Sequence, residues 1–225
     1  MVVGARRIRP VPDAAPTRPV PRGRHAPPLE VRLDRQRGRL FAAAAIVFAR
    51  SGYADATAEA ISREAGMSKA TFYEHFANKE QCIVALFDEA AAGIARDIRD
   101  VAERRYPSYE ERVHAGVSAF VAELNRRPAL AQTLIVEVIG AGPRAMERRD
   151  ATLQAYADWL FADNARTAAA YGAATFASPD DAFAVIGAIF ELVSRQMRTG
   201  RPASAQELVP VIERVLLGTL APARG

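Results

Sequence analysis

The 225-residue sequence contains one cysteine, no long apolar run and no recognisable export signal. The single cysteine, Cys82, excludes an internal disulfide. No stretch approaches the roughly 18 uninterrupted apolar residues that a membrane span requires. Prolines follow the N-terminal arginines where a secretory signal would place its apolar segment. We therefore expect a cytoplasmic protein without membrane contact.

Metal-binding and catalytic patterns are also missing. The three histidines, His25, His75 and His114, share no metal-ligand spacing with one another or with Cys82. No serine or cysteine lies in a recognisable nucleophile setting. The sequence thus predicts no catalytic residues, no metal and no cofactor. Cys82 is interpreted as a small core residue, with a redox sensor as the alternative.

Charge is unevenly distributed. Residues 1–30 hold six arginines against two acidic residues, and residues 31–225 balance at 24 against 24. The first 32 residues mix proline and arginine without apolar periodicity, so we predict a disordered arm. Nonspecific DNA contact by this arm and a plain solvated tail both remain open.

From Leu33 onward the apolar residues recur at helical spacing, and no segment shows convincing strand alternation. The first helix is predicted to end at the sequence RSGY, where Gly52 allows a left-handed stop. The fold class is therefore predicted to be all-α. The further helices are expected at 58–64, 69–75, 79–104, 109–126, 128–139, 143–170, 180–198 and 204–220.

A helix-turn-helix is predicted at about residues 55–74. Thr57 and Ser68 each precede a short amphipathic stretch and are suitable N-caps, while Gly66 supplies the turn. Met67 and Phe72 have the spacing of a hydrophobic staple around the second cap. This pattern is typical of a motif that inserts its second helix into the DNA major groove.

The two lysines of the chain, Lys69 and Lys79, bracket this second helix. Phe72 and Phe76, four residues apart, are expected to pack inward. Asn78 is expected to cap the next helix, and Lys79 in its first turn to reach the DNA backbone. The remaining faces would offer contacts to base edges or phosphates from Lys69, Ala70, Thr71, Tyr73 and His75.

The segment TAEAISREAGMSKATFYEHFANKE resembles the DNA-binding signature of the tetracycline-repressor (TetR) family of bacterial regulators. The resemblance covers Arg37 to about Phe87, with Phe72 and Cys82 as slight departures. It implies a DNA-binding domain over residues 33–80, followed by a helical effector and dimerisation domain over 81–225. It also implies a homodimer formed by the last two long helices. The positions that it implies approach the operator are Thr57, Ser68, Lys69, Ala70, Thr71, Tyr73, His75 and Lys79.

The part of the chain after residue 80 carries more bulky apolar residues than one short helical layer requires, so they could line a ligand cavity. The candidates are Phe120, Leu124, Glu137, Tyr156 and Trp159, with His114 as a further polar candidate. Ordinary core packing explains most of them equally well. The chemistry of the ligand does not follow from them.

The last two long helices carry broad apolar stripes, which we interpret as a four-helix dimer interface. A protein that binds a two-fold symmetric DNA site needs a second subunit. The alternative is that the apolar stripes are buried within one subunit. The expected interface residues are Phe183, Ile186, Gly187, Phe190, Val193, Met197, Val209, Ile212 and Leu216.

A competing hypothesis starts from the sequence LIVEVIGAGPRA. It reads as an apolar strand followed by G-x-G-x-x-A, with Asp163 about 20 residues further on, as in a dinucleotide-binding fold. Pro143 and the flanking helical patterns argue against it.

The main prediction is a ligand-responsive transcriptional regulator, a repressor that binds a palindromic operator as a homodimer and is released by a small-molecule effector. The alternative is an NAD(P)-dependent oxidoreductase.

Overall fold

The computed structural model of the protein describes residues 28–221. The chain divides into two compact units, residues 1–36 and residues 37–225. The described part of the first unit is the start of helix α1 (Leu29–Asp55). Residues 29–32, which were predicted to be disordered, are helical, and residues 1–27 of the predicted arm lie outside the described residues.

The second unit is built from helices. Apart from one isolated bridge between Thr175 and Ala221, residues 28–221 contain no β-structure, which confirms the predicted all-α fold. After α1 the elements are α2 (Ala58–Glu64), α3 (Lys69–His75), α4 (Lys79–Ala102), α5 (Tyr109–Arg126), α6 (Pro128–Ile135), η1 (Glu137–Gly140), α7 (Pro143–Tyr171), α8 (Pro179–Thr199), η2 (Ala205–Leu208) and α9 (Val209–Thr219).

Three helices begin at the caps predicted from the sequence. The side chain of Thr57 accepts a hydrogen bond from the Ala60 amide at 3.1 Å, and that of Ser68 accepts one from the Thr71 amide at 3.0 Å. Asn78 does the same at the start of α4. Each cap satisfies an amide that the first helical turn leaves without a backbone partner.

Glycine closes the first and second helices. Gly52 has φ 75° and ψ 160°, which interrupts α1 near its end. Gly66, between α2 and α3, has φ 63°. Residues with a Cβ rarely adopt such positive φ values, so these glycines set the turns that orient the recognition segment.

Two predicted helices are each divided in the structure. The predicted helix at 128–139 is α6 followed by the 3₁₀ turn η1, and the one at 204–220 is η2 followed by α9. Pro210 occupies the first turn of α9. Because proline has no amide hydrogen, it cannot continue an α-helical ladder from the residues before it. A new helix therefore starts there.

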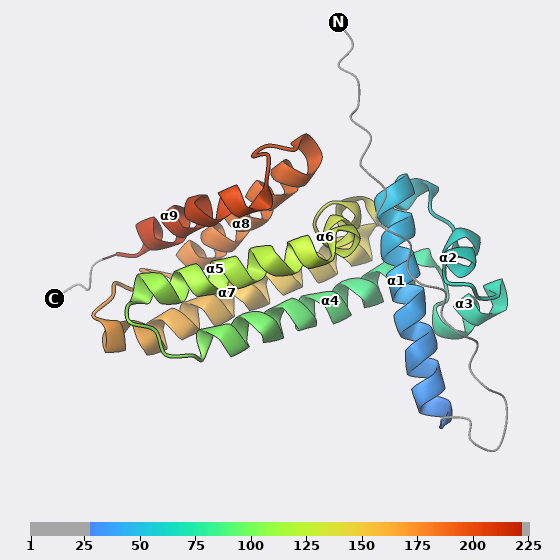
Figure 1. Cartoon of the computed structure of the whole chain (residues 1–225), viewed down its shortest axis with the longest axis horizontal. Helices are drawn as coiled ribbons and strands as arrows, with labels where there is room; N and C mark the ends of the chain where they lie inside the picture. The colour runs from blue at the N-terminus through green and yellow to red at the C-terminus, as the bar shows by residue number, and fades with distance from the viewer. Residues whose placement is uncertain (1–27, 222–225) are drawn as a thin grey trace, which may run out of the picture. The chain divides into compact units, whose positions relative to one another are not determined.

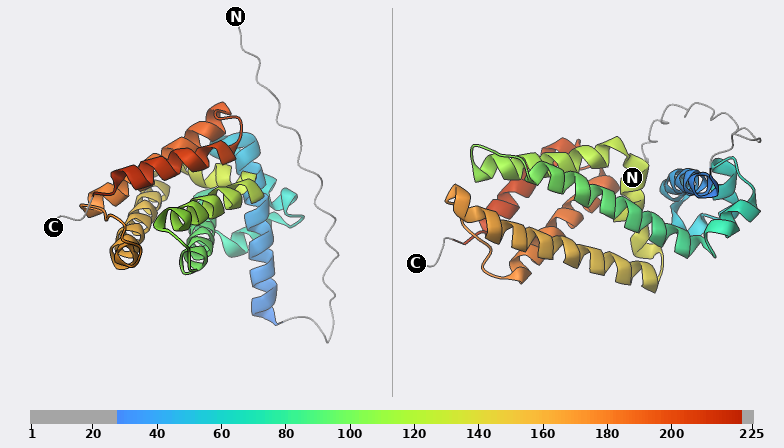
Figure 2. Two further views of the ribbon diagram at one scale, coloured as in Figure 1. Left: turned by 60° about the vertical axis from the view of Figure 1, so that its left-hand side comes forward. Right: turned by 90° about the horizontal axis from the view of Figure 1, so that it is seen from below.

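The long helices after α3 pack as neighbours (Figures 1 and 2). Helix α4 packs against α5 and α7, and α8 packs against α7 and α9. Helix α9 also packs against α5. Helices α2 and α3 pack on each other. In the described part of the chain, no helix combines the length and apolarity needed to cross a membrane.

Cys82 lies fully buried in the core near the start of α4. Burial raises the pKa of its thiol to about 12. Since the thiolate is the reactive form, native protein at pH 7 should react slowly with a thiol reagent, and denatured protein should take up one equivalent. Stopped-flow labelling checks this. Rapid labelling of the folded protein would instead support the redox-sensor alternative.

Candidate DNA-binding surface and ligand cavity

The inner face of α3 is aromatic. Phe72 and Phe76 are buried, their ring centroids are 5.5 Å apart, and Phe76 lies 5.5 Å from Phe41 of α1. The guanidinium of Arg37 sits 5.1 Å from the centroid of Phe41 and 5.5 Å from that of Phe76. The predicted inward packing is confirmed, and it holds α3 against the first helix.

The outer face of α3 presents the predicted contact residues together. Lys69, Ala70 and Tyr73 are exposed, whereas Thr71 and His75 are partly buried. The hydroxyl of Thr71 lies 2.9 Å from that of Ser68, so it takes part in the cap. This arrangement offers a cation, small side chains and an aromatic hydroxyl on one short helix. Their contact with DNA stays a prediction.

Lys79 is engaged within the protein. Its ammonium donates to the carbonyls of Tyr53 and Ala54 at 2.8 Å each and to that of Ala56 at 3.1 Å, and it lies 4.5 Å from the ring centroid of Tyr53. An ammonium has three rotatable donors on a flexible stem, which suits three converging carbonyls at the end of α1. The structure therefore gives Lys79 a capping role that the sequence did not indicate.

Replacing Lys79 by methionine should lower the free energy of unfolding by about 1–3 kcal/mol, because the carbonyls lose charged donors. The salt dependence of DNA binding should stay nearly unchanged. The matched control is Lys69→Met, which removes an exposed lysine and should lower the slope of log K against log salt by about 0.9. Anisotropy titrations at several salt concentrations measure both. A similar fall for Lys79→Met would support the predicted phosphate contact.

Glu137 lies at the same junction. One carboxylate oxygen accepts a hydrogen bond from the Tyr53 amide at 2.9 Å, and the other accepts one from the side chain of Gln132 at 3.2 Å. The end of α1 is thus held on one side by η1 and on the other by the start of α4. Glu137, predicted to line the ligand pocket, instead binds the end of α1.

A cavity of about 120 Å³ lies among α4, α5, α7, α8 and α9. Of the residues predicted to form a ligand pocket, Phe120, Tyr156 and Trp159 line this cavity, and ligand binding there stays a prediction. Leu124 and Glu137 are not among its lining residues. Leu124 is buried in the core, and Glu137 is bound to α1 as described above. His114 lies on the exposed side of α5, where its ring bonds to Glu213.

Most of the expected dimer residues are used inside the subunit. Val193 and Val209 are buried in the core. Phe183, at 41% exposure, is the clearest outward-facing member of the set, while Gly187 and Met197 are partly buried. The apolar stripes of α8 and α9 therefore serve largely to close the subunit. The members of the set that line the cavity are Ile186, Phe190, Ile212 and Leu216.

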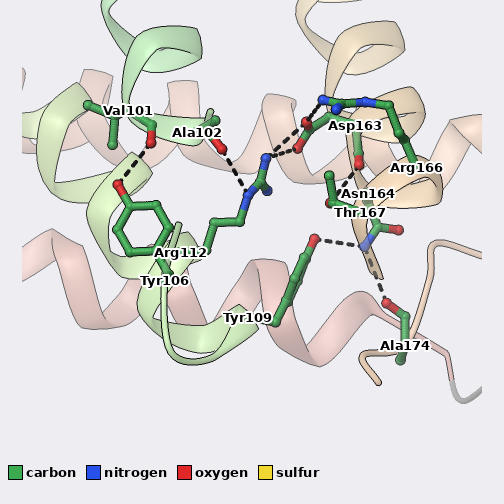
Figure 3. A network of polar contacts seen from close by, with 10 residues as sticks. All are labelled: Val101, Ala102, Tyr106, Tyr109, Arg112, Asp163, Asn164, Arg166, Thr167 and Ala174. Atoms are coloured by element: carbon green, nitrogen blue, oxygen red, sulfur yellow. Dashed lines mark hydrogen bonds and ion pairs between the residues drawn. The ribbon is translucent and has the colours of Figure 1, made fainter. Parts of the chain in front are cut away.

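A buried ion pair forms one part of the cavity lining (Figure 3). Arg112 of α5 donates to both carboxylate oxygens of Asp163 of α7, at 2.9 and 2.7 Å, and to the carbonyl of Ala102 at 3.1 Å. Arg166 approaches Asp163 from the solvent side at 2.7 Å. This pair was not predicted from the sequence, because its members lie 51 positions apart in the chain. The only indication in the sequence was that Arg112 and Asp163 each lie among apolar residues in a helical pattern.

The glycine-rich segment has a different structure from the one that dinucleotide binding requires. The residues before it form α6 and η1 instead of a strand, and Gly142 and Pro143 start α7. Asp163 is the partner of Arg112 inside a helix bundle. The oxidoreductase hypothesis therefore lacks its βαβ unit in this segment.

A capped helix-turn-helix on an all-α body defines a DNA-binding protein of the helix-turn-helix class. Residues 40–86 match the family model of bacterial regulatory proteins of the tetR family. The match confirms the predicted resemblance of this segment to the DNA-binding region of TetR-family regulators.

Comparison with known proteins gives a curated relative over part of the chain and solved structures of similar fold. The chain is 33% identical over 91 residues to the HTH-type transcriptional activator FasR of Mycolicibacterium smegmatis, and the aligned region spans 39% of each chain. The fold is similar to that of the fatty acid degradation regulator FadR from Bacillus halodurans, with a TM-score of 0.70, 21% identity, and coverage of 81% of this chain and 94% of that one. FadR from Bacillus subtilis, solved in complex with stearoyl-CoA, gives a TM-score of 0.69 at 20% identity, covering 82% and 99%.

Proposed function

We propose that this protein is a ligand-responsive transcriptional repressor that binds a palindromic operator as a homodimer and is released by a small-molecule effector. The observation that carries the proposal is the recognition helix α3. It is capped by Ser68, fixed from behind by Phe72 and Phe76, and exposes Lys69, Ala70 and Tyr73. We assign residues 33–80 to DNA binding and residues 81–225 to effector binding and dimerisation.

In the proposed complex, Ala70 and Thr71 face base edges, while Lys69, Tyr73 and His75 bind phosphates or guanine. Thr57 and Ser68 lie at helix N-termini, where free amides favour an anionic phosphate. Lys79 contributes by holding the end of α1 instead of touching the duplex. If Ala70 and Thr71 face base edges, a change of operator sequence should alter the affinity of this surface for DNA.

We propose that the dimer forms through the outer sides of α8 and α9, with Phe183 of α8 in the interface. Binding of successive major grooves on one face of DNA requires recognition helices about 34–36 Å apart. Sedimentation of the purified protein tests the dimer. The Phe183→Glu variant should sediment as a monomer and lose operator affinity.

The cavity and the DNA-binding helices are connected by α4. Ile94 and Ile98 of α4 line the cavity, and Lys79 at its first position holds the end of α1. Glu137, from the other side, binds the same turn of α1 through Tyr53. We propose that an effector in the cavity shifts α4 and thereby changes the separation of the two recognition helices. The effector can change the equilibrium between the two arrangements by no more free energy than the difference between its binding free energies for them.

Selection of bound genomic fragments, followed by footprinting, tests this function. We expect recovery of a two-fold symmetric site with half-sites one helical turn or a multiple of it apart. Transcription from that fragment in vitro should fall when protein is added and recover with effector. Increased transcription would make the protein an activator, as the name of the FasR relative states for that protein. Failure to enrich any sequence would contradict the proposal.

A further inference from the structure

We infer that Asp163 determines the ligand specificity of the cavity: by neutralising Arg112 it makes the cavity select an uncharged apolar molecule over an ion. This inference rests on the proposed function, in which the cavity holds the effector. It adds the chemical class of that effector and names the residue that sets it.

The cavity walls are almost entirely apolar. Helices α4, α5 and α7 supply Ile98, Val117 and Leu160, and α8 and α9 supply aliphatic side chains of the same kind. The ring of Phe190 lies 6.4 Å from that of Phe120 and 6.2 Å from that of Tyr156. A site with these walls binds mainly through the removal of apolar surface from water.

The tyrosine hydroxyls at the cavity are already bonded within the protein. Tyr156 donates to the carbonyl of Ala91 at 2.8 Å. The hydroxyl of Tyr109 accepts a hydrogen bond from the side-chain amide of Asn164 at 2.7 Å (Figure 3). A ligand gains little by competing with these bonds, because each broken bond leaves a buried polar group without its partner.

The two buried charges of the lining are also matched with each other. The side chains of Arg112 and Asp163 are 7% and 5% exposed, and one guanidinium nitrogen, Nη2, donates to both carboxylate oxygens (Figure 3). A ligand carboxylate would have to displace Asp163 or lie beside it, and an ammonium would meet Arg112 in the same way. Either ion would lose its hydration without gaining an unopposed partner.

The other charged residues near this pair are open to solvent. Arg166 binds Asp163 from outside, and its side chain is 69% exposed. Arg99 also lines the cavity but is exposed. Their charges are screened by water, so they add little attraction for an ion inside the apolar space. An anionic group held by Arg99 would lie at the solvent side of the cavity.

The volume of about 120 Å³ fits a small hydrocarbon group. For comparison, an engineered apolar cavity of about 150 Å³ stays dry and binds benzene. A short alkyl chain or a single aromatic ring is therefore the chemistry that matches the space. It could belong to a free alcohol or hydrocarbon, or to the uncharged end of a larger molecule.

The test uses three probes of equal chain length at pH 7: octan-1-ol, octanoate and octylammonium. The only tryptophan of the chain, Trp159, lines the cavity, so intrinsic tryptophan fluorescence reports on binding directly. We expect wild-type protein to bind the alcohol at least ten times more tightly than either ion. Octanoate or octylammonium binding as tightly as the alcohol would overturn the inference.

The variant Asp163→Asn keeps the size of the side chain and removes the charge that balances Arg112. We expect it to raise the affinity for octanoate, relative to octan-1-ol, at least tenfold. The matched control is Asp158→Asn on the same helix, an exposed aspartate whose loss should leave the ratio unchanged. An unchanged ratio in folded Asp163→Asn would overturn the role of Asp163. If that variant does not fold, the wild-type comparison decides the ligand class.

The probes are titrated without DNA, which separates this inference from the proposed function. If the alcohol binds with the expected preference but does not change operator affinity, the ligand class stands and the regulatory function fails. If an ion binds at Trp159 more tightly than the alcohol and releases the operator, the function stands and the inference fails. An octanoyl thioester, added as a fourth probe, distinguishes a chain carried by a larger molecule from a free neutral ligand.

Discussion

Replacing Asp163 by alanine is expected to lower the free energy of unfolding by about 3–5 kcal/mol, because it leaves the guanidinium of Arg112 buried without its counter-charge. Arg112 is 7% exposed and donates to both oxygens of this carboxylate. The lost stability should appear as a lower urea concentration at the unfolding midpoint, with an unchanged dependence of the free energy of unfolding on urea concentration. Equilibrium unfolding followed by circular dichroism measures it.

The matched control is Arg166→Ala, which removes the other partner of Asp163. Since the side chain of Arg166 is 69% exposed, its loss should cost less than about 1 kcal/mol. The double replacement Arg112→Met with Asp163→Leu should recover most of the lost stability, because an apolar pair of similar volume needs no compensation. A loss below about 1 kcal/mol for Asp163→Ala would show that the pair is not desolvated in solution.

The second large effect is expected at the recognition helix. Phe72 is fully buried, so Phe72→Ala should cost about 3–5 kcal/mol and abolish sequence-specific DNA binding. The binding is lost because α3 is positioned by this ring and by Phe76, whose centroid lies 5.5 Å away. Unfolding curves and anisotropy titrations with the selected operator measure the two effects.

The neighbouring residue provides the control for this prediction. Tyr73 is 50% exposed on the outer face of the same helix. Tyr73→Ala should change stability by less than about 0.5 kcal/mol, as surface substitutions usually do, while lowering operator affinity. If Tyr73→Ala left operator affinity unchanged, the outer face of α3 would not be the DNA-binding surface.

The local structure of the DNA-binding region was predictable from the sequence because its determinants are close in the chain. Thr57, Ser68 and Asn78 each bond to an amide three residues ahead, so the signal for each cap lies within one helical turn. The paired spacing of Phe72 and Phe76 gave the buried face in the same way. Capping and periodicity thus determine these helices with little help from tertiary structure.

The contacts that connect the helices were not predictable in this way. Arg112 and Asp163 are separated by 51 positions, and Tyr53 and Glu137 by 84. A single sequence shows only that each is a polar residue in a helical pattern. Asp163 was considered solely for its distance from the glycine-rich segment, and Glu137 for its place in a helix thought to face the cavity. Their partners are set by packing between helices.

The apolar stripes of α8 and α9 illustrate a further limit. Periodicity identifies an apolar face but not what covers it. Phe190 and Ile212 lie on the stripes expected to form the dimer, yet both line the cavity within the subunit. The outward-facing part of α8, with Phe183, is narrower than the stripe as a whole. That these two helices form the dimer interface stays a prediction.

The central claim, that ligand binding in the cavity and DNA binding by α3 are coupled, is tested most directly by titrating octan-1-ol against Trp159 fluorescence in free and in operator-bound protein. Linkage requires that the ligand weaken operator binding by the same factor as the operator weakens ligand binding. We expect both factors to be equal and between about 5 and 150, the usual range of coupling between two sites. Equal ligand affinity in the free and bound states would contradict the account.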